Sequence, residues 1–138
     1  MKKLLLLSIS LLALSFLPNT FAHDLKGAIA SEDRTPKNVV RDVYRHPYET
    51  LDFFGIKQDM TVIELSPGGG WYTEILANYI HYPGTLIAAH FNPDAGGYYK
   101  RGRANFEKKM NSSPMYGRVE IVNIDSTLAE PNSVDAVL

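Results

Sequence analysis

The sequence predicts an α/β fold, a Rossmann-like parallel sheet preceded by N-terminal helices. Short β-branched runs alternate with amphipathic helices through short connections, a pattern that gives right-handed crossovers between parallel strands. A glycine cluster directly follows the first such run and opens a helix, as in α/β folds that hold a nucleotide-like ligand. The composition is globular, because 45% of the residues are hydrophobic and 21% are charged.

The first 22 residues have the pattern of a cleavable export signal. Lys2 and Lys3 form a basic start, residues 4–17 are an apolar run, and a short segment then ends in the small Ala22, as signal peptidase requires. We expect cleavage after Ala22 and export to the periplasm, because the short leader is of bacterial type. The alternative is an uncleaved membrane anchor, although the run is short for a transmembrane helix. After cleavage we expect no stable membrane span.

Residues 23–60 predict an N-terminal helical segment that follows a loose leader over 23–32. Thr35-Pro36 can begin a helix, since threonine caps helices and proline suits the first helical position. Pro47 can begin a second helix, which Gly55 would end. The apolar side chains expected to share one face of the first helix are Val39, Val40, Val43 and Tyr44.

Residues 61–138 predict the sheet and its crossover helices. The expected strands cover 61–65, 85–89, 119–124 and, as the beginning of a fourth strand, 134–138. The second run is apolar throughout, as a strand buried on both faces should be. Helical spacing of apolar side chains marks the first crossover helix at Tyr72, Ile75, Leu76, Tyr79 and Ile80. The second crossover helix is marked by Tyr99, Arg103, Phe106 and Met110.

Composition excludes several classes of function. The absence of cysteine excludes disulfides, thiolate catalysis and zinc sites built on cysteine. A formal net charge of −1 gives no support for nucleic-acid binding, which usually leaves a strongly basic footprint. No metal site is predicted.

The glycine turn carries the functional signal. Glu64 ends the first strand, and Gly68, Gly69 and Gly70 lead into the following helix. Glycine lets the backbone approach a ligand and adopt positive φ, and the helix offers unpaired N–H groups there. The P-loop pattern is absent because no lysine follows Gly70, and the dinucleotide pattern fails because Thr73 stands at its third glycine position. The alternative is a tight turn that binds nothing, with Glu64 capping the helix.

Glu64-x-Ser66-x-Gly68-x-Gly70 resembles motif I of the class I S-adenosylmethionine-dependent methyltransferases, with Ser66 in place of the first glycine. The chain also resembles a group of exported bacterial predicted methyltransferases, through the runs at 45–55 and 64–77. The likeness covers nearly all of the chain after the leader. It implies a methyltransferase-type sheet of order 3-2-1-4-5-7-6, of which this chain carries strands 1 to 3 and the start of strand 4.

The resemblance implies that residues 61–138 are a partial Rossmann-like domain that binds S-adenosyl-L-methionine. Glu64 would face the methionine end of the cofactor, through its ammonium or a water. Gly68 and Gly70 would let the backbone pass beneath the cofactor, in the same turn as Ser66 and Gly69.

Of the residues after the second and third strands, one departs from the family's pattern and one matches it. His90 stands where an acid usually grips the ribose hydroxyls, so either His90 or the later Asp94 would bind there. Asp125 matches the acid that accepts from the adenine amino group. Each also has a structural interpretation, because Asp94 lies in a turn-forming Asn-Pro-Asp sequence and Asp125 could accept from Ser126 and Thr127.

We therefore expect the N-terminal, cofactor-binding portion of an exported methyltransferase-like protein, C-terminally truncated. The methyl acceptor and the catalytic residues are not predicted. Two alternatives are a non-catalytic exported protein that binds another small ligand with the same fold, and an inactive truncated fragment.

Overall fold

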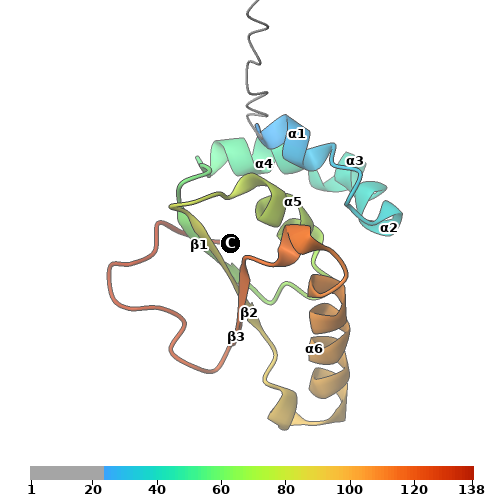
Figure 1. The fold of residues 1–138 in the computed structure, drawn as a ribbon, viewed down its shortest axis with the longest axis vertical. Coiled ribbons are helices and arrows are strands. Elements are labelled where there is room, and N and C mark those ends of the chain that lie inside the picture. The colour runs from blue at the N-terminus through green and yellow to red at the C-terminus, as the bar shows by residue number, and fades with distance from the viewer. Residues whose placement is uncertain (1–23) are drawn as a thin grey trace, which may run out of the picture.

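A parallel four-stranded sheet forms the centre of the chain in the computed structural model, which describes residues 24–138 (Figure 1). The predicted signal peptide over 1–22 lies outside the described residues. The strand order is β3-β2-β1-β4, and every neighbouring pair is parallel. The strands are β1 (Thr61–Leu65), β2 (Thr85–His90), β3 (Val119–Asn123) and β4 (Ala136–Val137).

Helices precede the sheet and connect its strands. The N-terminal helices are α1 (Leu25–Ile29), α2 (Pro36–Val39), α3 (Asp42–Arg45) and α4 (Pro47–Phe53). The crossovers contain α5 (Trp71–Tyr79) and α6 (Gly97–Met110), together with the 3-10 turns η1 (Pro93–Ala95) and η2 (Pro114–Tyr116). Within residues 24–138, none of the helices combines the length and apolar character that a membrane crossing requires.

The predicted fold class is confirmed. The order of the four strands is the 3-2-1-4 part of the sheet that the resemblance implied, and β1 spans the predicted residues. β2 extends one residue beyond its predicted end, and β4 is only two residues long. In the register, Leu65 lies opposite Ala89, and His90 lies opposite Asn123. The carboxyl ends of β1, β2 and β3 therefore meet at one edge of the sheet.

The two faces of the sheet are covered differently. On one face, α5 packs on Val62 and Leu86, and α6 packs on Ala88 through Phe106 and Met110. On the other face, the connection over 124–135 packs on the strands, and Figure 1 shows it as a long loop beside the sheet. The buried residues under this connection are Ile63, Ile87 and Ala89, and its own contributions are Leu128, Ala129 and Val134.

The N-terminal segment differs from its prediction in two respects. The predicted loose leader contains α1, because Asp24 caps that helix by accepting from the Gly27 N–H and because Leu25 and Ala28 pack into the core. The helix predicted from Pro36 is divided into α2 and α3. The face expected to be buried is instead 41–83% exposed at Val39, Val40, Val43 and Tyr44.

Polar contacts explain why the apolar face of α2 and α3 is exposed. The Trp71 indole N–H donates to the backbone oxygen of Asn38 and to a carboxylate oxygen of Asp42, each at 3.0 Å. Both nitrogens of the Arg34 guanidinium tip donate to the Asp42 carboxylate, at 2.6 and 2.8 Å. The segment is thus oriented by buried hydrogen bonds to α5, and its apolar stripe faces outward.

Candidate functional site

The turn between β1 and α5 has left-handed backbone at every second residue. Ser66, Gly68 and Gly70 have φ values of 54°, 58° and 77°. For an L-residue this conformation costs about 1 kcal/mol that glycine does not pay. Ser66 therefore adopts a backbone conformation that favours glycine, as Gly68 and Gly70 do.

Contacts from β2 and α6 hold this turn in place. The Ser66 N–H donates to the Ala89 oxygen at 3.0 Å and extends the pairing of β1 with β2. The Lys109 ammonium of α6 donates to the Gly69 oxygen at 2.7 Å. A Cβ on Gly70 would lie 3.3 Å from the Phe106 ring, so α6 also packs closely against the end of the turn. The turn is consequently a braced structure with Ser66 and Gly68 exposed.

Glu64 combines a capping role with a position at a cavity. Its carboxylate accepts from the Thr73 hydroxyl at 2.5 Å, in the first turn of α5. Only 4% of the residue is exposed. Burial raises the pKa of Glu64 to about 7, against the lowering effects of the Thr73 hydrogen bonds and of Lys109 and Arg45. The carboxyl group is therefore poised to gain charge when a cation approaches.

His90 is built into the fold. Its Nδ1 accepts from the Phe91 N–H at 2.7 Å, so Nε2 carries the proton and donates to the Gly68 oxygen at 3.2 Å. The ring is 1% exposed and lies 4.8 Å from the Phe106 ring. Burial lowers the pKa of His90, which favours the neutral form. A ribose hydroxyl could reach a ring nitrogen only if one of these hydrogen bonds were exchanged.

Asp94 and Asp125 lie in exposed loops that Asn92 joins. The Asn92 amide nitrogen donates to Asp125 at 3.0 Å, and its oxygen accepts from the Asp94 N–H at 2.9 Å. The Asp94 backbone thus makes the turn expected of Asn-Pro-Asp. The partner of Asp125 is a side chain of the neighbouring loop, whereas Ser126 hydrogen-bonds to the Asn123 oxygen.

Three cavities border the glycine turn, and one of them, of about 220 Å³, lies between Thr35 and Lys109 beside Gly68 and Gly69. Another cavity of about 220 Å³ lies on the side of β4 and the N-terminal helices, where Arg45, Glu64 and Ser66 line it. A cavity of about 570 Å³ lies on the side of α6, where Gly68, Gly69 and His90 contribute. The structure thus divides the predicted site residues between the two sides of the turn. Asp94 and Asp125 belong to the lining of none of the three cavities.

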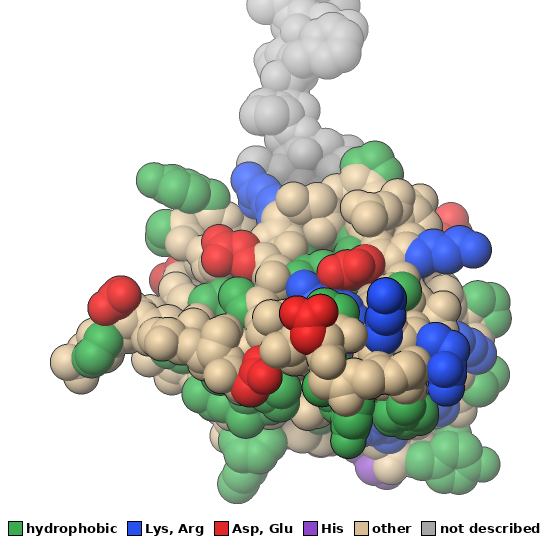
Figure 2. Space-filling view, turned by 90° about the horizontal axis from the view of Figure 1, so that it is seen from below, with side chains coloured by type: hydrophobic (Ala, Val, Ile, Leu, Met, Phe, Trp, Pro, Cys, Tyr) green, Lys and Arg blue, Asp and Glu red, His purple; other side chains and the backbone are tan. Residues whose placement is uncertain are grey.

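Charge is unevenly distributed around these cavities. Figure 2 views the molecule from the lower end of Figure 1, where α6 begins. Most Lys and Arg side chains of this face gather on one side, and most Asp and Glu side chains occupy the middle and the other side. The larger cavity fits this pattern, because Lys37 and Arg101 line it without any carboxylate.

A buried polar cluster beside the turn was not predicted. Glu74 of α5 is fully buried, accepts from the Thr35 hydroxyl at 2.6 Å and pairs with Lys109. Its carboxylate also lies 3.9 Å from Arg34. The sequence signal for the burial of Glu74 was its position, because it follows Trp71 by three residues and precedes Ile75 on the core-facing side of a helix.

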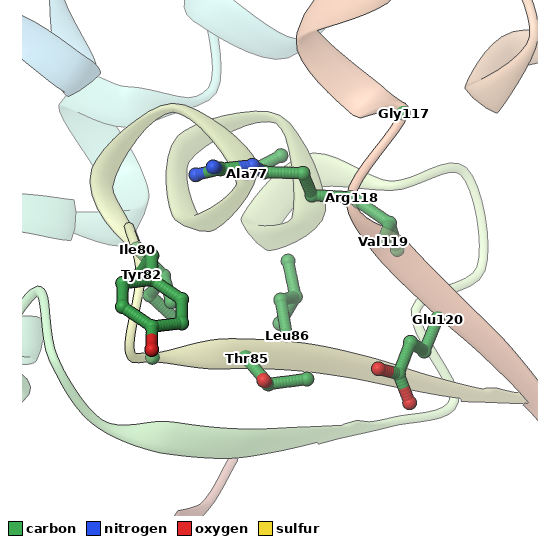
Figure 3. A pocket seen from close by; sticks show the side chains of 10 residues that line it. Ala77, Ile80, Tyr82, Thr85, Leu86, Gly117, Arg118, Val119 and Glu120 are labelled. Atoms are coloured by element: carbon green, nitrogen blue, oxygen red, sulfur yellow. The ribbon is translucent and has the colours of Figure 1, made fainter.

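A further cavity lies at the opposite edge of the sheet. It measures about 370 Å³ and borders the beginnings of β2 and β3. Figure 3 shows Leu86 in its interior, between Tyr82 on one side and Glu120 on the other. Ligands of open parallel sheets bind beyond the carboxyl ends of the strands, so this cavity is not the candidate site.

No family model matches the chain, and no curated protein matches it. Among solved structures, it is similar to a cyclopropane-fatty-acyl-phospholipid synthase-like protein from Lactobacillus casei, with 14% identity and a TM-score of 0.48. The match covers 74% of this chain and 38% of that protein, so the chain spans well under half of its length. A likeness this distant says nothing about ligand or activity.

Proposed function

We propose that this chain is the S-adenosylmethionine-binding portion of a methyltransferase-like protein whose acceptor is still to be identified. The observation that carries the proposal is the turn after β1, with left-handed backbone at Ser66, Gly68 and Gly70 directly after a strand whose last two residues are Glu64 and Leu65. This is the geometry that an acid-x-G-x-G-x-G motif encodes, at the edge of the sheet where such folds bind ligands.

Two of these cavities supply surfaces suited to the parts of such a ligand. The larger one contains the Phe91 and Tyr98 rings, whose centroids lie 6.3 Å apart, beside the exposed backbone of Gly68. Aromatic rings next to bare backbone favour a purine nucleoside. The smaller cavity offers Glu64, whose carboxyl group can accept from an ammonium. A ligand lying across the turn would use both.

The chemical contribution of these residues is binding and orientation. A bound sulfonium cofactor supplies an activated methyl group, and methyl transfer gains most of its acceleration from holding the acceptor in line with that group. Glu64 and the braced turn would fix one side of this arrangement. We assign no catalytic residue.

Calorimetric titration of the mature chain with S-adenosylmethionine and S-adenosylhomocysteine tests the proposal. Gly68→Ala should weaken binding about tenfold or more, since it changes the backbone beneath the ligand. Gly55→Ala is a matched control, because Gly55 also has positive φ and open space where a Cβ would lie, with nothing within 4 Å, but is outside the site. Folded wild-type protein that binds neither compound would overturn the proposal.

The surroundings of Gly68 and His90 also favour a second function. In this alternative the chain is an exported protein that binds an anionic small ligand without catalysis. His90 braces Gly68 where an acid would grip ribose, and Lys37 and Arg101 line the cavity without a carboxylate. S-adenosylmethionine is made in the cytoplasm, which also favours another ligand in an exported protein. Saturable binding of adenosine monophosphate by protein that does not bind S-adenosylhomocysteine would support this second function.

We also propose that residues 1–22 direct export and are removed after Ala22. The support is the basic, apolar and small-residue pattern of the leader. Expression of the full chain in a bacterium should give a periplasmic protein whose mass corresponds to a first residue of His23. A full-length protein recovered with the membrane fraction would instead identify an uncleaved anchor.

A further inference from the structure

The cavity at the opposite edge of the sheet has an apolar floor that belongs to the main core. Leu86 and Ile80 are 3% and 4% exposed and belong to the core cluster that α5 forms with β1 and β2. Both line the cavity, and so does Val119, which packs against the same cluster. The core is therefore open here to a hollow of about 370 Å³. This volume lies near the lower end of the range of small-molecule sites, which is about 300–1,000 Å³.

Two charged side chains of opposite sign border this hollow. Arg118 directly precedes β3, and Glu120 is the second residue of β3. Both are exposed, and within residues 24–138 the side chain of neither takes part in an ion pair or a hydrogen bond. In Figure 3, Arg118 extends across the upper part of the view, and Glu120 lies below it and to the right. The hollow thus offers a free cation and a free anion above an apolar floor.

The backbone keeps these two charges apart. Residues two apart in an extended chain are separated by about 7 Å, and Arg118 and Glu120 are not paired with each other. Tyr82 stands on the other side of Leu86 from Glu120 and forms a further wall of the hollow (Figure 3). A small ligand can therefore lie between the two charges with its apolar part on Leu86.

The charges decide which class of apolar compound fits. An apolar monoanion would meet the Glu120 carboxylate, and an apolar amine would meet the Arg118 guanidinium. A compound with one charge of each sign uses both groups and brings no unpaired charge to the site. An α-amino acid is the simplest such compound, and its side chain can cover the apolar floor.

We propose that this cavity is an additional binding site, which takes a free α-amino acid with an apolar side chain. Arg118 would bind the carboxylate and Glu120 the ammonium, while the side chain of the ligand lies on Leu86. The site shares no lining residue with the cavities at the glycine turn, so the proposal goes beyond the proposed function and is independent of it.

Calorimetric titration of the mature chain with leucine tests the proposal. Binding should be saturable, with a Kd in the millimolar range or tighter. Leucinamide lacks the carboxylate and isocaproate lacks the ammonium, so each should bind about fivefold or more weakly than leucine. Glycine has both charges but no apolar side chain, and it should bind about tenfold or more weakly.

Two exposed substitutions separate the charges without touching the core. Glu120→Gln should weaken leucine about fivefold or more but strengthen isocaproate, because a like charge is removed. Arg118→Gln should weaken leucine similarly but strengthen leucinamide. A general disturbance of the fold would weaken every compound. Glu130→Gln and Lys108→Gln are the matched controls and should change nothing, because both residues are exposed and neither lines this cavity.

Amide chemical shifts locate the site. Leucine should shift the N–H signals of Gly84 and Gly117, which line the cavity, and leave those of Gly68 and Gly69 in place. Absence of saturable binding by the folded chain would overturn the proposal. So would shifts confined to the glycine turn, or equal weakening of all three leucine-like compounds by both variants. Binding of S-adenosylmethionine is measured separately, so either proposal can fail while the other stands.

Discussion

Glu64 illustrates how much a single residue reveals before its surroundings are known. The sequence placed an acid at the end of a strand and left two roles open, ligand contact or helix capping. The structure has Glu64 bonded to Thr73 at the start of α5 and also lining a cavity, so capping does not exclude the other role. Residue identity and spacing do not give burial, which depends on residues that are distant in the sequence.

Replacing Glu64 by glutamine should change how stability depends on pH. The pKa of Glu64 is about 7 in the folded chain and 4.5 in its ordinary state, so between these values the folded state binds more protons than the unfolded state. Stability should therefore fall as pH rises through this window. This difference in pKa corresponds to a loss on the order of 3 kcal/mol in the free energy of unfolding once Glu64 is ionised.

Urea unfolding at pH 5 and pH 8 measures this effect. Glu64→Gln should lose less stability between the two pH values than wild type does, because glutamine has no proton to release. Taking the difference between the two proteins removes the contribution of other titrating groups. Parallel pH dependences would show that Glu64 ionises as easily in the folded chain as in the unfolded one.

The glycine turn gives a second prediction at the residue scale. Gly70→Ala should destabilise the fold by about 1–3 kcal/mol, because φ is 77° and the new Cβ would lie 3.3 Å from the Phe106 ring. Gly69→Ala is the matched control, since Gly69 lacks positive φ and has nothing within 4 Å of its Cβ position. Urea unfolding should separate the two variants, and equal stabilities would contradict the packing described for α6.

At the scale of elements, helical periodicity located α5 and α6 but misjudged the N-terminal segment. Phe106 and Met110 are buried as their spacing predicts. In α2 and α3, by contrast, the apolar stripe is exposed, and the buried side chains include Asn38. Periodicity counts apolar residues, whereas this segment is oriented by Trp71, some 30 residues later in the chain. Such partners appear only when the fold is known.

The ion pair between Lys109 and Glu74 should carry much of the attachment of α6 to α5. Lys109→Met should destabilise the protein by about 3 kcal/mol, because it leaves the fully buried Glu74 short of its cation and frees the Gly69 oxygen. Lys108→Met is the control, since Lys108 is exposed on the same helix. Chemical unfolding of both variants measures the difference. Similar losses of stability in the two variants would mean that Arg34 and Thr35 are sufficient to stabilise the buried Glu74 carboxylate.

At the scale of the whole molecule, the alternation of strands and helices predicted the sheet correctly. Right-handed crossovers that proceed in one direction from β1 to β2 to β3 place α5 and α6 on the same face, as observed. The cover of the opposite face was not predictable. It comes from residues 124–135, whose few apolar side chains follow neither a helical nor a strand period.

That cover leads to the last prediction. Leu128 packs on the cluster of Ile63 and Ile87, so Leu128→Asp should loosen the 124–135 connection and expose the sheet. Stability should fall by about 1–3 kcal/mol, and binding of a hydrophobic fluorescent dye should rise. Thr127→Asp adds the same charge at an exposed neighbouring position and should change stability by less than about 0.5 kcal/mol.

Amide exchange would locate the change, because faster exchange in the connection, with β1 and α5 still protected, distinguishes local opening from global unfolding. If Leu128→Asp and Thr127→Asp behaved alike, the connection would not be what keeps this face of the sheet from water.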